Sequence, residues 1–132
     1  MKPTQKLLAL TLILCLLFIA CLPDDGDVSN YDKDIERLIS LKTEIEALAA
    51  TSVCNDDSDC KYIAFGSKPC GGPWTYLVYS TSIDTVELET QVQQYNQLES
   101  IFNAQYGIAS DCAITQEPLE VICESNKCVA VY

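Results

Sequence analysis

Two stretches of the chain carry apolar residues at the spacing of an α-helix. In residues 31–50 the apolar positions form one stripe and charged positions cover the other side, which predicts an amphipathic helix on the surface of a domain. Acidic residues are frequent near the start of this stretch, where the helix dipole favours them. Ser29 or Asn30 is therefore the expected N-cap.

A second helix is predicted from Ser82 or Asp84 to about Tyr106, because apolar residues recur there three and four positions apart. Gly107 is expected to end this helix, since glycine readily adopts the left-handed conformation that closes a helix. Four shorter segments are rich in branched and aromatic residues and are predicted to be strands: 61–65, 74–80, 119–123 and 128–132.

The order helix, strand, strand, helix, strand, strand predicts the class of the domain. It favours a small α+β domain over residues 30–132, with about four mostly antiparallel strands and two helices. We expect the strands to form one sheet with both helices on one face. The length of 132 residues fits one such domain and not two.

The beginning of the chain has a different pattern, in which two lysines precede an uncharged apolar run over residues 7–20. Such a run has the length of a signal-peptide core and is short for a membrane span, which needs about 20 apolar residues. The run ends at residues 18–21, Phe-Ile-Ala-Cys, which resembles the lipobox of bacterial lipoproteins. The resemblance implies that residues 1–20 are a signal peptide and that Cys21 carries diacylglycerol, which anchors the protein in a lipid bilayer.

Residues 21–29 comprise this cysteine and an acidic stretch that we expect to be a tether. The acidic stretch resembles the surface-export signal of Bacteroidetes-type lipoproteins, although a solvated tether explains it equally well. An uncleaved N-terminal anchor helix is the alternative to a lipoprotein. The expected location is the cell envelope, in the outer membrane, with the periplasmic and the outward-facing side both left open.

The charge of the chain limits the classes of partner. Nineteen acidic residues against eight basic ones give a net charge of −11, and such a surface repels phosphate backbones, so no nucleic-acid partner is expected. The sequence contains no histidine. This excludes Ser-His and Cys-His nucleophilic catalysis and histidine-ligated zinc.

The eight cysteines fit an exported protein. Cys15 would leave with the signal peptide and Cys21 would carry the lipid, so an even number remains for structural disulfides. No pair among them has the spacing of a CxxC redox or zinc motif. The pairing stays open at this point, with a Cys123–Cys128 bond across the last hairpin as one option. The six domain cysteines are Cys54, Cys60, Cys70, Cys112, Cys123 and Cys128.

No metal or cofactor is expected. Asn55, Asp57 and Asp59 alternate like the first ligands of an EF-hand, but Cys60 stands where that loop needs glycine and Gly66 where it needs a bidentate glutamate. A polar loop closed by disulfides is the better interpretation.

The segment 68–74 is the candidate for partner binding. Its prolines fix the backbone, its paired glycines permit a sharp reversal, and Cys70 can tie it to the body. Lys68 is expected to stand out on an acidic surface, and Trp74 offers a large apolar anchor. The alternative is a tight turn that leads into a buried strand. The candidate residues are Lys68, Pro69, Gly71, Gly72, Pro73 and Trp74.

The cysteine spacing and the Cys-Gly-Gly-Pro turn of residues 54–128 resemble those of small, uncharacterised Cys-rich exported bacterial proteins, and this resemblance implies no activity. The first functional hypothesis is a non-enzymatic binding module with an unknown protein or glycan partner. The second is an inhibitor of an extracellular hydrolase such as a protease, acting through loop 68–74. The third is a carboxylate-based hydrolase, since acids are plentiful although no two stand at a recognisable spacing.

Overall fold

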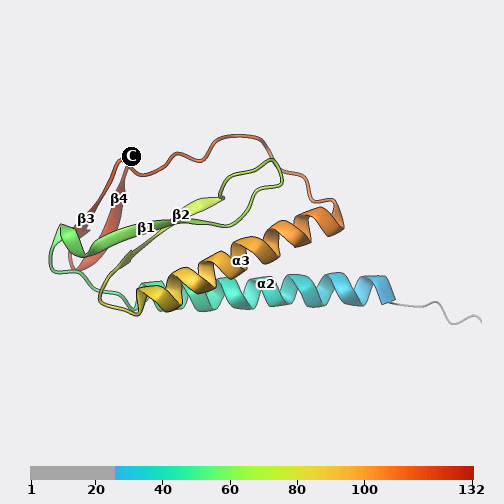
Figure 1. The fold of residues 1–132 in the computed structure, drawn as a ribbon, viewed down its shortest axis with the longest axis horizontal. Coiled ribbons are helices and arrows are strands. Elements are labelled where there is room, and N and C mark those ends of the chain that lie inside the picture. The colour runs from blue at the N-terminus through green and yellow to red at the C-terminus, as the bar shows by residue number, and fades with distance from the viewer. Residues whose placement is uncertain (1–25) are drawn as a thin grey trace, which may run out of the picture. The chain divides into compact units, whose positions relative to one another are not determined.

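The computed structural model describes residues 26–132, and within it Tyr31–Tyr132 form one compact unit. The predictions about the signal peptide and Cys21 lie outside the described residues. The elements along the chain are α2 (Gly26–Ala50), the short helix η1 (Asp57–Asp59), β1 (Cys60–Phe65), β2 (Thr75–Ser80), α3 (Thr85–Tyr106), β3 (Glu120–Glu124) and β4 (Lys127–Val131) (Figure 1).

The predicted α+β class with four antiparallel strands is confirmed, but the single sheet is wrong. The strands form two separate hairpins, β1 with β2 and β3 with β4, both antiparallel. The hairpins touch through β2 with β4 and through β1 with β3, without a shared ladder of hydrogen bonds. Strands that follow each other in the sequence pair as hairpins, whereas pairing between distant strands depends on long-range packing that local patterns do not specify.

Both helices form where the apolar spacing predicts them. Asp84 caps α3 by accepting the backbone N–H of Glu87 at 3.0 Å, and Gly107 ends the helix in the left-handed region with φ 60°. Helix α2 begins at Gly26, earlier than predicted, so Ser29 and Asn30 lie within the helix and do not cap it. Several polar residues in that stretch can supply a cap, so the sequence does not fix the first residue.

The two helices cover one face of the β1–β2 hairpin, as Figure 1 shows. Strand alternation directs Ile63, Phe65, Leu77 and Tyr79 toward the helices, where they pack against the core. The buried core consists of Leu38, Ile45, Ala49, Phe65, Tyr79, Leu88, Val92, Tyr95 and Phe102. This core and the disulfides of the described residues lie inside Tyr31–Tyr132.

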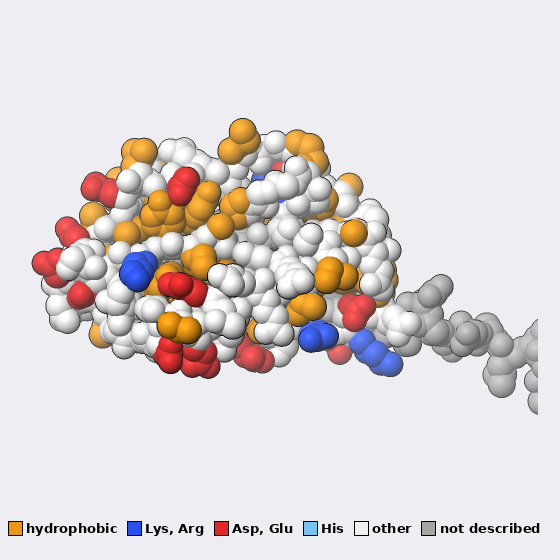
Figure 2. Space-filling view, in the orientation of Figure 1, with side chains coloured by type: hydrophobic (Ala, Val, Ile, Leu, Met, Phe, Trp, Pro, Cys, Tyr) orange, Lys and Arg blue, Asp and Glu red, His pale blue; other side chains and the backbone are white. Residues whose placement is uncertain are grey.

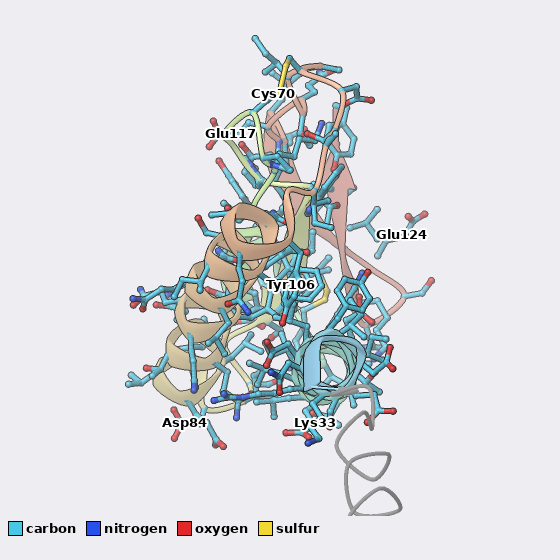
Figure 3. The ribbon with its side chains drawn as sticks, turned by 90° about the vertical axis from the view of Figure 1, so that its right-hand side faces the viewer. Lys33, Cys70, Asp84, Tyr106, Glu117 and Glu124 are labelled. Atoms are coloured by element: carbon cyan, nitrogen blue, oxygen red, sulfur yellow. A yellow bond between two sulfur atoms is a disulfide. The ribbon has the colours of Figure 1, made fainter. Side chains whose placement is uncertain are left out.

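The other face of the β1–β2 hairpin is covered by the β3–β4 hairpin and by the long connection between α3 and β3 (Figure 1). In that connection Glu117 accepts a hydrogen bond from the Tyr62 hydroxyl at 3.0 Å. Figure 3 shows Cys70 and Glu117 together at the end of the molecule away from Lys33 and Asp84 of the helical layer. The tip of loop 68–74 at Cys70 therefore lies away from most of the helical layer, whereas Trp74 at its other end lies next to both helices.

The surface of the described residues is acidic in places. On the face drawn in Figure 2, Asp and Glu side chains gather at the end where η1 and the β3–β4 hairpin lie and along the helical edge. In the part of the chain that the structure describes, neither long helix has the apolar stretch that crossing a membrane requires.

Candidate functional site

All six domain cysteines are paired, as the sequence predicts. The bonds are Cys54–Cys123, Cys60–Cys128 and Cys70–Cys112, with Cα–Cα distances of 5.8, 5.5 and 5.4 Å. The hypothesised Cys123–Cys128 bond is wrong, although these two residues stand opposite each other in the β3–β4 register. Cys123 is bonded instead to Cys54, and Cys128 is bonded to Cys60. Two of the three bonds therefore attach the last hairpin to the connection between α2 and η1, at Cys54, and to the start of β1, at Cys60.

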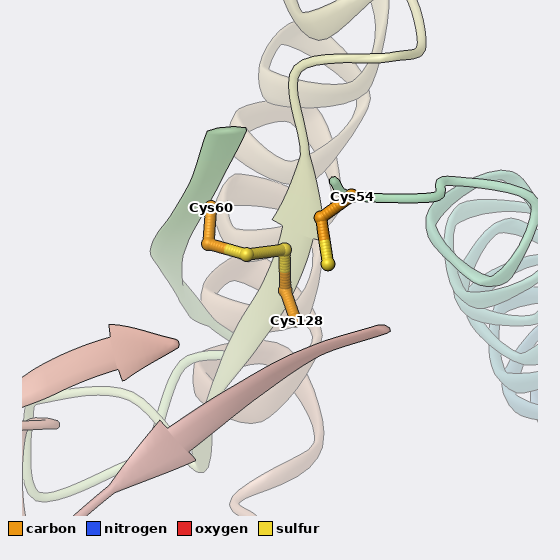
Figure 4. A group of neighbouring side chains, drawn as sticks. All are labelled: Cys54, Cys60 and Cys128. Atoms are coloured by element: carbon orange, nitrogen blue, oxygen red, sulfur yellow. A yellow bond between two sulfur atoms is a disulfide. The ribbon is translucent and has the colours of Figure 1, made fainter. Parts of the chain in front are cut away.

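Three sulfur atoms gather at this fastening point. The sulfurs of Cys54, Cys60 and Cys128 lie within 4.8 Å of one another (Figure 4). A metal ion binds thiolates, and these sulfurs are all engaged in disulfides. The cluster is therefore a structural clamp.

Helix α3 holds the end of β1 through a row of polar side chains. Asn96 accepts the Gly66 N–H at 2.7 Å and donates to the Ala64 carbonyl at 3.0 Å. Glu99 accepts the Ser67 N–H at 2.5 Å, and Asn103 donates to the Ser67 carbonyl at 2.7 Å. Hydrogen bonds from a helix thus replace the strand ladder where β1 ends.

This row was not found from the sequence. Its members are spaced three and four residues apart beside the apolar stripe of α3, and that spacing is the signal that could have identified it. These hydrogen bonds from α3 hold the backbone of Gly66 and Ser67, and they therefore fix the position at which loop 68–74 begins.

The loop 68–74 itself is a small closed turn. The Lys68 N–H donates to the Gly72 carbonyl at 2.8 Å, and the Gly71 N–H donates to the Lys68 carbonyl at 2.9 Å. Gly71 and Gly72 have φ of 95° and 81°, values that favour glycine, as their spacing predicts. The tip, residues 69–72, is exposed, and the bond from Cys70 to Cys112 ties it to the connection after α3.

Lys68 does not stand out on the surface, so that expectation is wrong. Only 9% of the residue is exposed. Its ammonium donates to the Ala113 carbonyl at 2.8 Å and to Asp111 at 3.3 Å, and it lies 5.3 Å from the centre of the Trp74 ring. Asp111 and Ala113 are more than 40 residues from Lys68 in the sequence, and the turn brings Trp74 next to it. Lys68 therefore joins the turn to the segment around Cys112.

Trp74 combines a fixed position with exposure. A Cβ on Gly66 would lie 2.6 Å from Cδ1 of Trp74, so the indole rests directly on that glycine. Yet 43% of Trp74 is exposed. An aromatic side chain that is both held in place and half exposed is suited to contact another molecule.

Trp74 lines a groove of about 350 Å³ between α2 and α3, which we call the Trp74 groove. Its other walls include Ile35, Ile39 and Lys42 from α2 and Glu99 and Phe102 from α3. The sequence predicts Trp74 at the candidate site but not these helical residues, because only the tertiary fold brings them to it.

Most polar groups at the groove are already bonded. The Tyr95 hydroxyl donates to Glu99 at 3.0 Å, and Glu99 also accepts the Ser67 N–H. Burial, together with the Glu99 charge and hydrogen bond, raises the pKa of Tyr95, so this hydroxyl stays protonated and continues to donate. These polar groups are therefore engaged within the protein, and a ligand in the groove meets mainly apolar surface.

Three further depressions are found on the described surface, one of which shares Leu38 and Phe102 with the Trp74 groove, and each of these four depressions is lined by a single acidic residue. These residues are Asp34, Glu46, Glu89 and Glu99. None of these four depressions holds the facing pair of carboxylates that a glycosidase uses. The feature best suited to a function is thus the Trp74 groove with the neighbouring turn. Comparison with protein-family models, with curated proteins and with solved structures gives no match for this chain.

Proposed function

We propose that this protein is an exported lipoprotein, anchored in the outer membrane through diacylglycerol on Cys21, whose domain binds a partner in the Trp74 groove without chemical conversion. The Trp74 groove is the observation that carries the binding function. Its volume falls within the range of small-molecule pockets, and its walls are apolar with few polar groups.

The rigidity of the site supports binding. Binding costs less entropy when the contact residues are already in place. Trp74 rests on Gly66, the turn behind it is closed by its own hydrogen bonds, and the Cys70–Cys112 bond restrains the tip. The site therefore needs little ordering when a partner arrives.

The cysteine pairing supports the lipid anchor. All six cysteines after residue 53 form disulfides with one another, so Cys21 has no partner among them. Once the proposed signal peptide, which contains Cys15, is removed, Cys21 is an odd cysteine in an oxidising compartment, and lipidation accounts for it.

Inhibition of an extracellular hydrolase is the second candidate. The exposed tip at residues 69–72 favours it, since the tip is presented by a disulfide. The burial of Lys68 removes the one charged side chain that this loop could offer to a protease. Binding in the Trp74 groove is therefore preferred.

A pull-down from native membranes tests the binding function. Lipidated wild-type protein is compared with Ile39→Glu, which places a charge on an exposed groove position, and with Val86→Glu, a matched change at an exposed position outside the groove. Material retained by wild type and Val86→Glu but lost by Ile39→Glu is expected. Equal retention by all three proteins would contradict a function of the groove.

A further inference from the structure

The walls of the Trp74 groove limit the chemistry of its occupant. Ile35, Leu38, Ile39 and Ile108 supply aliphatic surface, and Trp74 closes one side. Burial of such surface favours an apolar ligand, because it removes apolar area of both groove and ligand from water. Hydrocarbon is the complementary surface.

Sugars fit this groove poorly, because the carboxylate of Glu99 and the amide nitrogen of Asn103 already have hydrogen-bond partners. Glu99 accepts hydrogen bonds on both of its oxygens, and the Asn103 amide donates to the Ser67 carbonyl. A ligand with many hydroxyl groups would lose its bonds to water and find few replacements.

One cation, Lys42, and one carboxylate, Glu99, line the groove, and both oxygens of Glu99 already accept hydrogen bonds. Lys42 has a side chain that is 50% exposed, and its ammonium lies 3.9 Å from Glu46 one helical turn away, the outer limit of an ion pair. An ammonium on the rim of an apolar groove is complementary to an anionic head group whose chain enters the groove.

We infer that the occupant of the Trp74 groove is a single aliphatic chain that ends in an anionic head, an amphiphile of the fatty-acid type. This inference rests on the binding function proposed above and names its ligand class. The chain lies against Ile35, Ile39 and Trp74, and the head pairs with Lys42. A volume of about 350 Å³ is near the lower end of small-molecule pockets, which suits one chain.

Fluorescence titration tests the ligand class, because Trp74 is the only tryptophan of the chain. Residues 22–132 without the lipid are titrated with dodecanoate and with dodecyltrimethylammonium, both below their micellar concentrations. Dodecanoate is expected to shift the Trp74 emission to shorter wavelength with saturation, and to bind more tightly than the cationic probe. The chain is strongly acidic, so unspecific attraction would favour the cation and the preference for the anion is a strict criterion.

Three variants locate the binding. Ile39→Glu is expected to weaken dodecanoate binding by about ten-fold or more, because it buries a charge against the chain. Lys42→Ala removes one exposed ion pair and should weaken it roughly two- to five-fold. Lys33→Ala changes another exposed lysine of α2 that does not line the groove, and should bind like the parent.

Three results would each overturn the inference. The first is no saturable response to dodecanoate. The second is a response that Ile39→Glu leaves unchanged. The third is equal binding of the two head groups. If dodecanoate fails to bind, but the pull-down still retains membrane material with wild type and loses it with Ile39→Glu, then the ligand class is wrong and the binding function stands. If dodecanoate binding and groove-dependent retention are both absent, the proposed function is contradicted as well.

Discussion

Replacement of Lys68 by alanine tests whether this lysine is a buried structural residue, as the structure shows, or an exposed surface residue, as the sequence predicts. The Lys68 ammonium donates to the Ala113 carbonyl at 2.8 Å and lies 5.3 Å from the centre of the Trp74 ring. Lys68→Ala removes both interactions and leaves the Ala113 carbonyl without this donor. The substitution should therefore destabilise the domain.

The magnitude follows from these contacts. A hydrogen bond from a charged donor contributes about 1.5–3 kcal/mol, and a cation–π contact with a half-exposed ring about 0.5–1 kcal/mol. The bond to Asp111 adds little, because that side chain is 73% exposed. Removal of the buried ammonium also relieves its desolvation, which offsets part of the loss. We expect the free energy of unfolding to fall by about 2–3 kcal/mol.

Urea denaturation of residues 22–132 with the disulfides intact measures this change. Lys33→Ala serves as the control, since Lys33 is exposed on α2 and its loss should alter the free energy of unfolding by less than about 0.5 kcal/mol. Lys68→Met keeps the apolar stem and should recover part of the loss. If Lys68→Ala unfolds within about 0.5 kcal/mol of the parent, the buried network around Lys68 is not as described.

Three further predictions concern the anchor, the disulfides and the position of Trp74. Cys21→Ser should abolish incorporation of labelled fatty acid and partitioning into detergent, and labelling at the wild-type level would refute lipidation. Thiol titration of denatured, unreduced residues 22–132 should find no reactive thiol, whereas two or more per chain would reopen a metal or redox role for the cysteines. Gly66→Ala should destabilise the domain by about 2 kcal/mol and shift the Trp74 fluorescence emission, because Gly66 has φ 85° and an added Cβ would lie 2.6 Å from the indole. If the stability and the emission of this variant equal those of the parent, Trp74 does not rest on Gly66.

The local elements could be predicted from the sequence, because their signals are local. Apolar spacing located both helices, and Asp84 and Gly107 mark the ends of α3 by the capping chemistry expected of them. The turn between β3 and β4 has Ser125 and Asn126 with positive φ, as a two-residue hairpin turn requires. The even number of domain cysteines predicted that all would pair.

The long-range arrangement could not be predicted in the same way. Cys123 and Cys128 stand opposite each other, yet each is bonded to a cysteine 69 or 68 residues away. Lys68 is buried by a segment 43 to 45 residues further along the chain. The Trp74 groove needs α2 and α3 beside a turn that follows β1. Each of these features depends on how distant segments pack, and no pattern within one segment encodes it.

Crosslinking in living cells tests the central claim most directly, namely that the Trp74 groove is the binding site. A photoreactive residue is placed at Ile39, in the groove, or at Val86, which is more exposed and lies outside it. With the lipid anchor intact, the account predicts that irradiation attaches a partner molecule at position 39 and none at position 86. Adducts that form equally at both positions, or only at position 86, would contradict it.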